Sequence, residues 1–267
     1  LRWREITPPE RGRLLFRVGQ LLDDRREELA RVLSRENGKT VRSALGEVQS
    51  AVDMALFAAG EGTRWYGKTV PSHLPRRWAL TRRHPVGVAG ILTSWNFPLA
   101  ITAWKLFPCL LCGNAAVLKS EENTPEITVL LVKILAAAGI PAGVVNLVHG
   151  KGPAAGEALV RHPGIDVVSF TGSSATGRLV GQACAARLAK VSLELGGKNA
   201  VVVMPDADLD LAMEGIVSGA FSLSGLPPFA GFWSKLTIFL AGADVGMWGP
   251  VAVAIFTSLL TLIAIFR

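Results

Sequence analysis

Asn96 and Glu194 are the residues whose type and setting could carry chemistry at a carbonyl group. Asn96 lies in W-N-F-P (residues 95–98) after an expected strand, and an amide at such a turn can direct N–H groups at a developing oxyanion. Glu194 ends another expected strand just before two glycines, where a carboxylate can act as a general base. Each signal is weak alone, because the first segment can be a packed turn and Glu194 can form an ion pair with Lys198.

A second group of residues has the chemistry needed to bind a nucleotide. Lys119 ends the expected strand 115–118, and Glu122 follows three residues later, at the edge where open α/β sheets bind ligands. The simpler interpretation of this pair is a surface salt bridge. Residues 170–177 predict a strand, a Gly/Ser turn and a helix, whose N-terminus offers N–H groups and a favourable dipole to phosphate. The spacing is not G-x-G-x-x-G, so the general dinucleotide fingerprint is absent.

The elements that must position these residues follow from hydrophobic periodicity. Helices are expected at 9–34, 43–60, 125–138, 153–161, 174–186 and 209–220. Extended segments are expected within 69–93, and strands at 115–118, 144–148, 166–170, 191–195 and 200–204. The charged run 23–28 is either an exposed face of the first helix or a junction between two helices. Strands that alternate with helices predict the α/β class, with a mostly parallel sheet flanked by helices.

Four motifs in this order resemble the aldehyde dehydrogenase superfamily over roughly residues 9 to 221. They are W-N-F-P (95–98), V-L-K-x-x-E-x-T-P (117–125), F-T-G-S-x-x-x-G (170–177) and L-E-L-G-G-K (193–198). The resemblance implies a Rossmann-like cofactor-binding half and a small-molecule aldehyde substrate. Members of the superfamily form homo-oligomers, and the resemblance implies the same here, although this chain lacks much of the subunit interface. Residues 61–72 look most like members that oxidise semialdehydes and aliphatic aldehydes.

The resemblance also implies roles for individual residues. Asn96 would hold the oxyanion and Glu194 would be the general base. The implied cofactor-binding residues are Trp95, Lys119, Glu122, Gly152, Gly156, Phe170, Gly172, Ser173, Leu195 and Gly196. The cofactor would be NAD rather than NADP, because the carboxylate of Glu122 would repel a 2′-phosphate.

The chain departs from the family pattern where the nucleophilic cysteine should lie. Pro228 stands at about that position, and no cysteine follows Cys184. Cys109, Cys112 and Cys184 lie on the wrong elements to substitute, so we expect acyl-enzyme chemistry to be impaired. A non-catalytic NAD-binding module is the alternative. The chain begins with Leu1 rather than Met, which we interpret as a fragment without its natural start.

Residues 222–267 have a different composition and form a second predicted domain after residues 1–221. Their charged residues are Lys235, Asp244 and Arg267, and residues 245–266 are an uncharged run of 22 residues. That length suits a transmembrane helix, with a buried core helix as the alternative. Residues 224–235 resemble a segment of antiporter-like membrane subunits, from multisubunit cation/proton antiporters or NADH:quinone oxidoreductases. We favour an accidental junction over a designed bifunctional protein.

Composition excludes several other functions. The formal net charge is +7, but neither a recognition motif nor interleaved aromatic residues accompany the basic residues. We therefore expect no nucleic-acid partner. Three cysteines make no disulfide framework, and the pair Cys109 and Cys112 has no second pair or clustered histidines, so we expect no metal site. Reduced thiols fit a cytoplasmic location for residues 1–221, with membrane association through the C-terminal segment.

Overall fold

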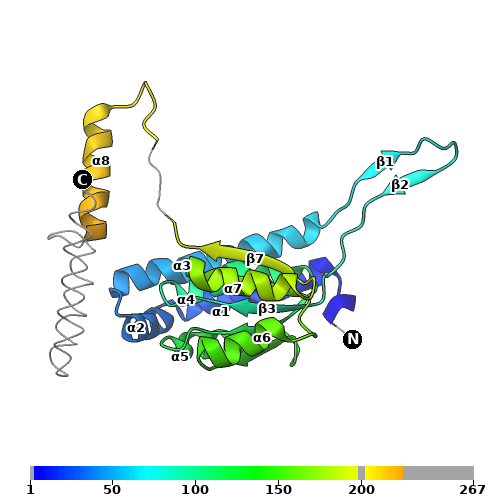
Figure 1. Ribbon diagram of the computed structural model, residues 1–267, viewed down its shortest axis with the longest axis horizontal. Coiled ribbons are helices and arrows are strands. Elements are labelled where there is room, and N and C mark those ends of the chain that lie inside the picture. The colour runs from blue at the N-terminus through cyan, green and yellow to red at the C-terminus, as the bar shows by residue number, and fades with distance from the viewer. Residues whose placement is uncertain (1–2, 198–201, 225–267) are drawn as a thin grey trace. The chain divides into compact units, whose positions relative to one another are not determined.

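The computed structural model describes residues 3–197 and 202–224 (Figure 1). The chain forms two compact units. The first comprises Leu1–Asn37 and Val41–Gly196 and holds the main sheet. The second comprises Gly38–Thr40 and the residues from Gly197 onward, including helix α8 (Leu209–Ser224). Each unit is considered by itself.

The first unit is built on a parallel five-stranded sheet. Its strands are β3 (Val88–Leu92), β4 (Ala115–Lys119), β5 (Val145–Val148), β6 (Val167–Gly172) and β7 (Lys190–Leu195). The spatial order is β5-β4-β3-β6-β7, so the chain starts in the middle, builds one side and then returns to build the other. This reversal creates a topological switch point between β3 and β6, and the predicted α/β fold with a parallel sheet is confirmed.

One face of the sheet is covered by two layers of helices. The inner layer is α4 (Pro98–Leu111) and α5 (Pro125–Ala137), and the outer layer is α1 (Pro8–Asp24), α2 (Arg26–Asn37) and α3 (Val41–Glu61). The sheet presents every second side chain to this face, among them Ile91 and Leu118, which join a core with Phe107 and Leu131. Burial of this apolar surface is the main force that fixes the outer helices on the inner ones.

The opposite face carries a smaller helical layer. It consists of the π-helical turn η3 (Gly152–Gly156), α6 (Glu157–Arg161) and α7 (Ser174–Ala185). Here the alternate strand residues Leu92, Val168 and Phe170 pack with Val180 and Cys184. The central strands β3 and β4 are therefore largely buried on both faces and read as apolar runs, whereas most residues of the edge strand β7 are exposed.

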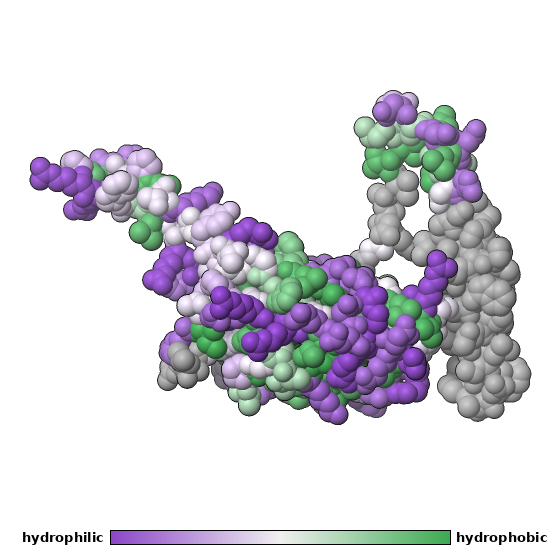
Figure 2. Space-filling view, turned by 180° about the vertical axis from the view of Figure 1, so that it is seen from behind, coloured by the Kyte–Doolittle hydropathy of each residue, from purple (hydrophilic) through white to green (hydrophobic). Residues whose placement is uncertain are grey.

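A separate antiparallel hairpin precedes the main sheet. It is formed by β1 (Thr69–Pro71) and β2 (Trp78–Leu80), with Val70 opposite Ala79. Every residue of both strands is exposed, and Trp78 retains 83% of its accessible surface. In Figure 2 apolar side chains interrupt the hydrophilic surface of this arm. Such a two-stranded sheet has little burial of its own to stabilise it.

The remaining differences from the sequence-based expectations are local. The charged run 23–28 is a junction, because α1 ends at Asp24 and α2 begins at Arg26. The helix expected at 153–161 is split between η3 and α6, and the described part of the strand expected at 200–204 (residues 202–204) is not a strand. Two short 3-10 turns, η1 (Trp3–Glu5) and η2 (Gly62–Arg64), were not expected.

The predicted membrane segment 245–266 and the antiporter-like residues 224–235 lie, except for Ser224, outside the described residues. Across residues 3–197 and 202–224, the structure contains no helix that is both long and apolar enough to span a bilayer.

Candidate functional site

The predicted cofactor residues gather at the carboxyl edge of the parallel sheet. Leu92, the last residue of β3, pairs with Lys119 on β4 and with Phe170 on β6. On the far side, Gly172 at the end of β6 pairs with Leu195 at the end of β7. Strand ends on both sides of the switch point therefore contribute to one edge, where open α/β sheets bind their ligands.

Lys119 is a buried cation at this edge. Its side chain is 6% exposed, and its ammonium makes no hydrogen bond or ion pair with a described residue. The surface salt bridge between Lys119 and Glu122 is thus not formed. A buried amine without a protein partner is costly unless another group compensates it. Lys119 therefore stays a candidate ligand-binding residue, since no described residue compensates its ammonium.

Glu121 and Glu122 differ in what they contact. The carboxylate of Glu121 accepts hydrogen bonds of 2.7 Å from both the backbone N–H and the side-chain amide of Asn123, and so holds the turn before α5. Glu122 is exposed and has no hydrogen bond or ion pair within the described chain. Only Glu122 keeps its carboxylate available beside Lys119.

Carboxylates already occupy the N-termini of the two helices that follow β3 and β4. Glu47, which is 2% exposed, accepts hydrogen bonds from the backbone N–H groups of Leu99 and Ala100 on α4. Glu36 accepts from those of Glu126 and Ile127 on α5. Both helix dipoles are thereby met by a negative charge of the protein itself.

The N-terminus of α7 has no such carboxylate. Its cap is the hydroxyl of Ser173, which accepts a 3.2 Å hydrogen bond from the N–H of Thr176. The N–H groups of Ser174 and Ala175 have no acceptor among the described residues. Among α4, α5 and α7, only α7 retains donors and an uncompensated dipole for a phosphate group at the carboxyl edge.

Buried hydroxyls without partners cluster at the same edge. Thr93 directly follows β3, Thr171 is the second-to-last residue of β6, and Thr124 directly precedes α5. Within the described residues these three account for all but one of the buried side-chain polar atoms that lack a hydrogen bond, the other being on Arg187. Unpaired buried polar groups are uncommon in proteins, so these hydroxyls mark a polar edge of the sheet.

The glycines of the predicted site differ in their surroundings. A Cβ on Gly172 would lie 2.4 Å from the ring of Phe170, and Gly156 is buried against Leu92. At Gly152 and Gly196 a Cβ would meet nothing within 4 Å. A Cβ at Gly172 would therefore clash with Phe170, whereas one at Gly156 would make only ordinary contact with Leu92, 3.4 Å away, and the cofactor contacts of all four glycines stay predictions. Gly177, which sequence reasoning quoted without a role, lets α7 approach Leu195, because a Cβ there would lie 2.4 Å from that side chain.

The predicted catalytic residues lie on the side of the sheet that α4 covers. Leu193 and Leu195 of β7 face α7, so the intervening Glu194 faces the other way. Asn96 lies in the turn from β3 into α4, where its Oδ1 accepts a 2.7 Å hydrogen bond from the hydroxyl of Ser94. Trp95 is exposed, and its carbonyl oxygen accepts from the amide of Asn37. The structure therefore places the predicted catalytic residue Glu194 on the opposite face of the sheet from α7.

Lys105 is a site residue that sequence reasoning missed. Its ammonium donates a 2.8 Å hydrogen bond to the hydroxyl of Ser169 on β6. Burial lowers the pKa of Lys105, and the nearby carboxylate of Glu194 opposes that shift. The available signal was a lysine within the apolar helix α4, but its partners are remote in the sequence.

None of the three cysteines is suited to act as a nucleophile. Burial raises the pKa of Cys109 to about 12 and also raises the pKa values of Cys112 and Cys184. At pH 8 only about one Cys109 in ten thousand would be a thiolate. The described residues also contain no group of three or more metal-binding side chains.

Comparison with known proteins decides the family. The profile of the aldehyde dehydrogenase family matches residues 1–226. The chain belongs to the aldehyde dehydrogenase family. It is 42% identical over 223 residues to the alpha-ketoglutaric semialdehyde dehydrogenase of Bacillus subtilis, which covers 84% of this chain and 46% of that enzyme. This aldehyde dehydrogenase chain thus spans about half the length of its curated relative.

Solved aldehyde dehydrogenase structures agree with this assignment. The NAD+ complex of an aldehyde dehydrogenase from Bacillus cereus superimposes with a TM-score of 0.78 at 39% identity, covering 86% of this chain and 47% of that one. An NADP-dependent enzyme from E. coli gives the same TM-score and identity over 82% of this chain and 46% of its own. Similar folds in the aldehyde dehydrogenase family therefore accompany either cofactor.

Proposed function

We propose that residues 1–221 form the NAD-binding part of an aldehyde dehydrogenase. The observation that carries this proposal is Lys119, a buried and unpartnered cation at the carboxyl edge of the sheet. The exposed carboxylate of Glu122 and the uncapped donors of α7 complete a set suited to ribose hydroxyls and a pyrophosphate. The likeness to a solved NAD+ complex supports the same assignment.

Each predicted residue then has a defined task toward the cofactor. Lys119 and Glu122 bind the hydroxyls of the adenosine ribose, and Ser173 with Gly172 admits the pyrophosphate to α7. By the family resemblance, Gly152 and Gly156 would line the adenine side, and Leu195 and Gly196 would pass near the nicotinamide. Trp95 and Phe170 are further implied cofactor contacts. NAD supplies the acceptor for a hydride when bound. We favour NAD over NADP because Glu122 would repel a 2′-phosphate.

The other side of the sheet supplies the aldehyde chemistry. The side-chain amide of Asn96 donates to the carbonyl oxygen of the substrate, and Glu194 removes a proton from water. The charge of Lys105 draws the carboxylate of Glu194 toward β6.

We further infer that this chain binds the cofactor but oxidises aldehydes poorly. No cysteine follows Cys184, Pro228 takes the expected place of the nucleophile, and the three thiols present are shifted away from ionisation. Without an attacking thiolate the reaction loses several orders of magnitude in rate. The exposed arm of β1 and β2 fits the homo-oligomers of the family, and free thiols fit a cytoplasmic location.

Calorimetric titration of the full chain with NAD tests the binding proposal. Replacing Lys119 with Ala should weaken NAD binding by about tenfold or more, because a hydrogen bond to a charged group contributes about 1.5–3 kcal/mol. The matched control is Lys133→Ala, which removes an exposed lysine of α5 that is not among the predicted cofactor-binding residues. Equal affinities in the two variants, or no heat with millimolar NAD, would contradict the proposal.

Aldehyde-dependent formation of NADH tests the catalytic part separately. The full chain should give no turnover above that of a Glu194→Gln variant, since neither can form the acyl-enzyme. Turnover that Glu194→Gln abolishes would show that a nucleophile is present after all, and it would leave the binding result intact.

A further inference from the structure

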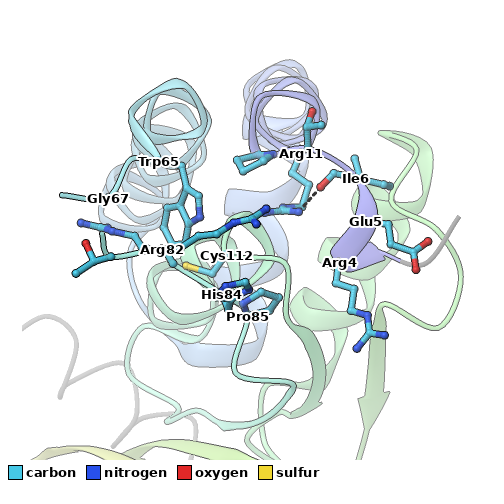
Figure 3. A pocket seen from close by; sticks show the side chains of 14 residues that line it. Arg4, Glu5, Ile6, Arg11, Trp65, Gly67, Arg82, His84, Pro85 and Cys112 are labelled. Carbon is cyan, nitrogen blue, oxygen red and sulfur yellow. Dashed lines mark hydrogen bonds between the residues drawn. The ribbon is translucent and has the colours of Figure 1, made fainter. Parts of the chain in front are cut away.

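A basic cavity lies at the amino edge of the sheet, away from the proposed NAD site. Its volume is about 380 Å³, and Figure 3 shows it between the start of α1, the end of α4 and the segment that leads into β3. Pro85 precedes β3 whereas the cofactor residues follow it, and the five residues of that strand separate the two edges by roughly 13 Å. The proposed NAD site therefore does not account for this cavity.

Arg11 is the buried cation of the cavity. It is 3% exposed, and its Nε donates a 2.7 Å hydrogen bond to the carbonyl oxygen of Leu111, while Nη1 donates to that of Ile6. Both acceptors are neutral, and burial lowers the pKa of Arg11. Gly113, with φ of +86°, makes room for the guanidinium, because a Cβ there would lie 3.1 Å from Arg11 Cζ. The fold thus places a desolvated positive charge here without a carboxylate.

A second guanidinium approaches the same place. Arg83 lies over the ring of Trp65 with Cζ 5.2 Å from its centroid. Arg11 and Arg83 both lower the pKa of the Cys112 thiol, but its burial is the larger influence and raises that pKa, so the thiol stays neutral. Two cations therefore converge on an uncharged group.

The cavity has little negative charge of its own. Among the described residues that line it, Glu5 is the single acid, and Figure 3 shows its side chain directed away from Arg11. Arg82 and His84 add further positive or titratable groups to the lining. The balance is an excess of guanidinium groups that one carboxylate ligand would not neutralise.

We propose that this cavity binds a small phosphorylated anion. A phosphate carries up to two negative charges and accepts paired hydrogen bonds from the planar fork of an arginine, which the exposed Arg83 can offer. Arg11, whose Nε and Nη1 already donate to backbone carbonyls, adds the attraction of its buried positive charge. The volume lies in the range of small-molecule sites, and the indole of Trp65 offers an apolar wall beside the cations. Neither Cys112 nor Arg11 has a part in the proposed aldehyde chemistry.

Titration of the full chain with inorganic pyrophosphate tests this proposal. We expect saturable binding that Arg83→Gln weakens by about tenfold or more, because one charge-assisted pair is lost. Arg83 is exposed, so its replacement should leave the fold intact, unlike replacement of Arg11. The matched control is Arg77→Gln, which removes the same charge from the exposed hairpin outside the cavity and should leave the affinity unchanged.

Three results would overturn the assignment. Equal weakening in Arg83→Gln and Arg77→Gln would reveal attraction to overall charge rather than a site, as would the absence of saturation. Malonate, a dicarboxylate, should bind at least about tenfold more weakly than pyrophosphate, and equal binding would exclude phosphate selectivity. Loss of NAD binding in the Lys119→Ala variant would leave these expectations unchanged, so the two sites fail independently.

Discussion

At the scale of single residues, Glu121 and Glu122 show how two adjacent carboxylates acquire different roles. Glu121 is used by the turn, and Glu122 is left for a ligand. We predict that Glu122→Gln improves NADP binding relative to NAD by about tenfold, because repulsion of a 2′-phosphate is removed. Paired titrations of NAD and NADP measure the ratio. Glu121→Gln is the control, and a similar change in that variant would show that the turn, not the charge, sets the preference.

The Cys109 thiol makes stability depend on alkaline pH. Its pKa is raised from 9.0 to about 12 by burial, so the unfolded chain releases this proton at lower pH than the folded one. The stabilisation is complete below about pH 9 and is lost as the pH rises toward 12, with an upper limit of about 4 kcal/mol. Urea unfolding at several pH values should show this decline, and Cys109→Ala should flatten it. An unchanged slope in the variant would place the titration elsewhere.

Sequence motifs predicted those polar residues whose position follows directly from the strand or turn that carries them. Lys119, Ser173 and Asn96 each end or follow a strand, and parallel pairing brings strand ends to one edge whatever the details of packing. Lys105 could not be found in this way, because its contact with Ser169 joins an inner helix to a strand 64 positions later. Burial and the absence of a partner, which distinguish Lys119 from a surface lysine, also appear only after folding.

At the scale of elements, α4 is positioned by a carboxylate from another helix. We predict that Glu47→Ala lowers the free energy of unfolding by about 2–4 kcal/mol, because two buried N–H groups lose their acceptor. Glu47→Gln keeps one acceptor oxygen and should cost less. Denaturant unfolding provides the measurement, and Asp53→Asn, an exposed change on the same helix, should stay within about 0.5 kcal/mol. Comparable losses at both positions would argue against the cap.

Periodicity predicted most helices and strands but not what caps them. The signal for Glu47 was present, since it lies between Ala44, Val48 and Ala51 on the apolar stripe of α3. A charged residue on such a stripe indicates a buried partner, yet that partner is a helix N-terminus 52 positions away. For residues 23–28 the sequence left two alternatives, an exposed helix face or a junction between two helices. Mixed charges suit both, so only the structure decides for the junction at Arg25.

At the scale of the whole molecule, every residue of the two hydrophobic core clusters belongs to the first unit. Among the residues whose burial the structure describes, the buried members run from Trp3 to Cys184. Because apolar burial dominates folding free energy, residues 1–196 should fold without the rest of the chain. Their thermal midpoint by circular dichroism should match that of the full chain within a few degrees.

The same comparison addresses the composition change after residue 221. Residues 222–267 carry few charges, so a chain that ends at 196 should form fewer high-molecular-weight species in sedimentation than the full chain at the same concentration. It also removes α8, whose side chains Leu209, Leu211 and Met213 are exposed. A broad, non-cooperative melt of the 1–196 chain would mean that later residues complete the core, and the proposed division into a cofactor-binding part and a separate remainder would then be wrong.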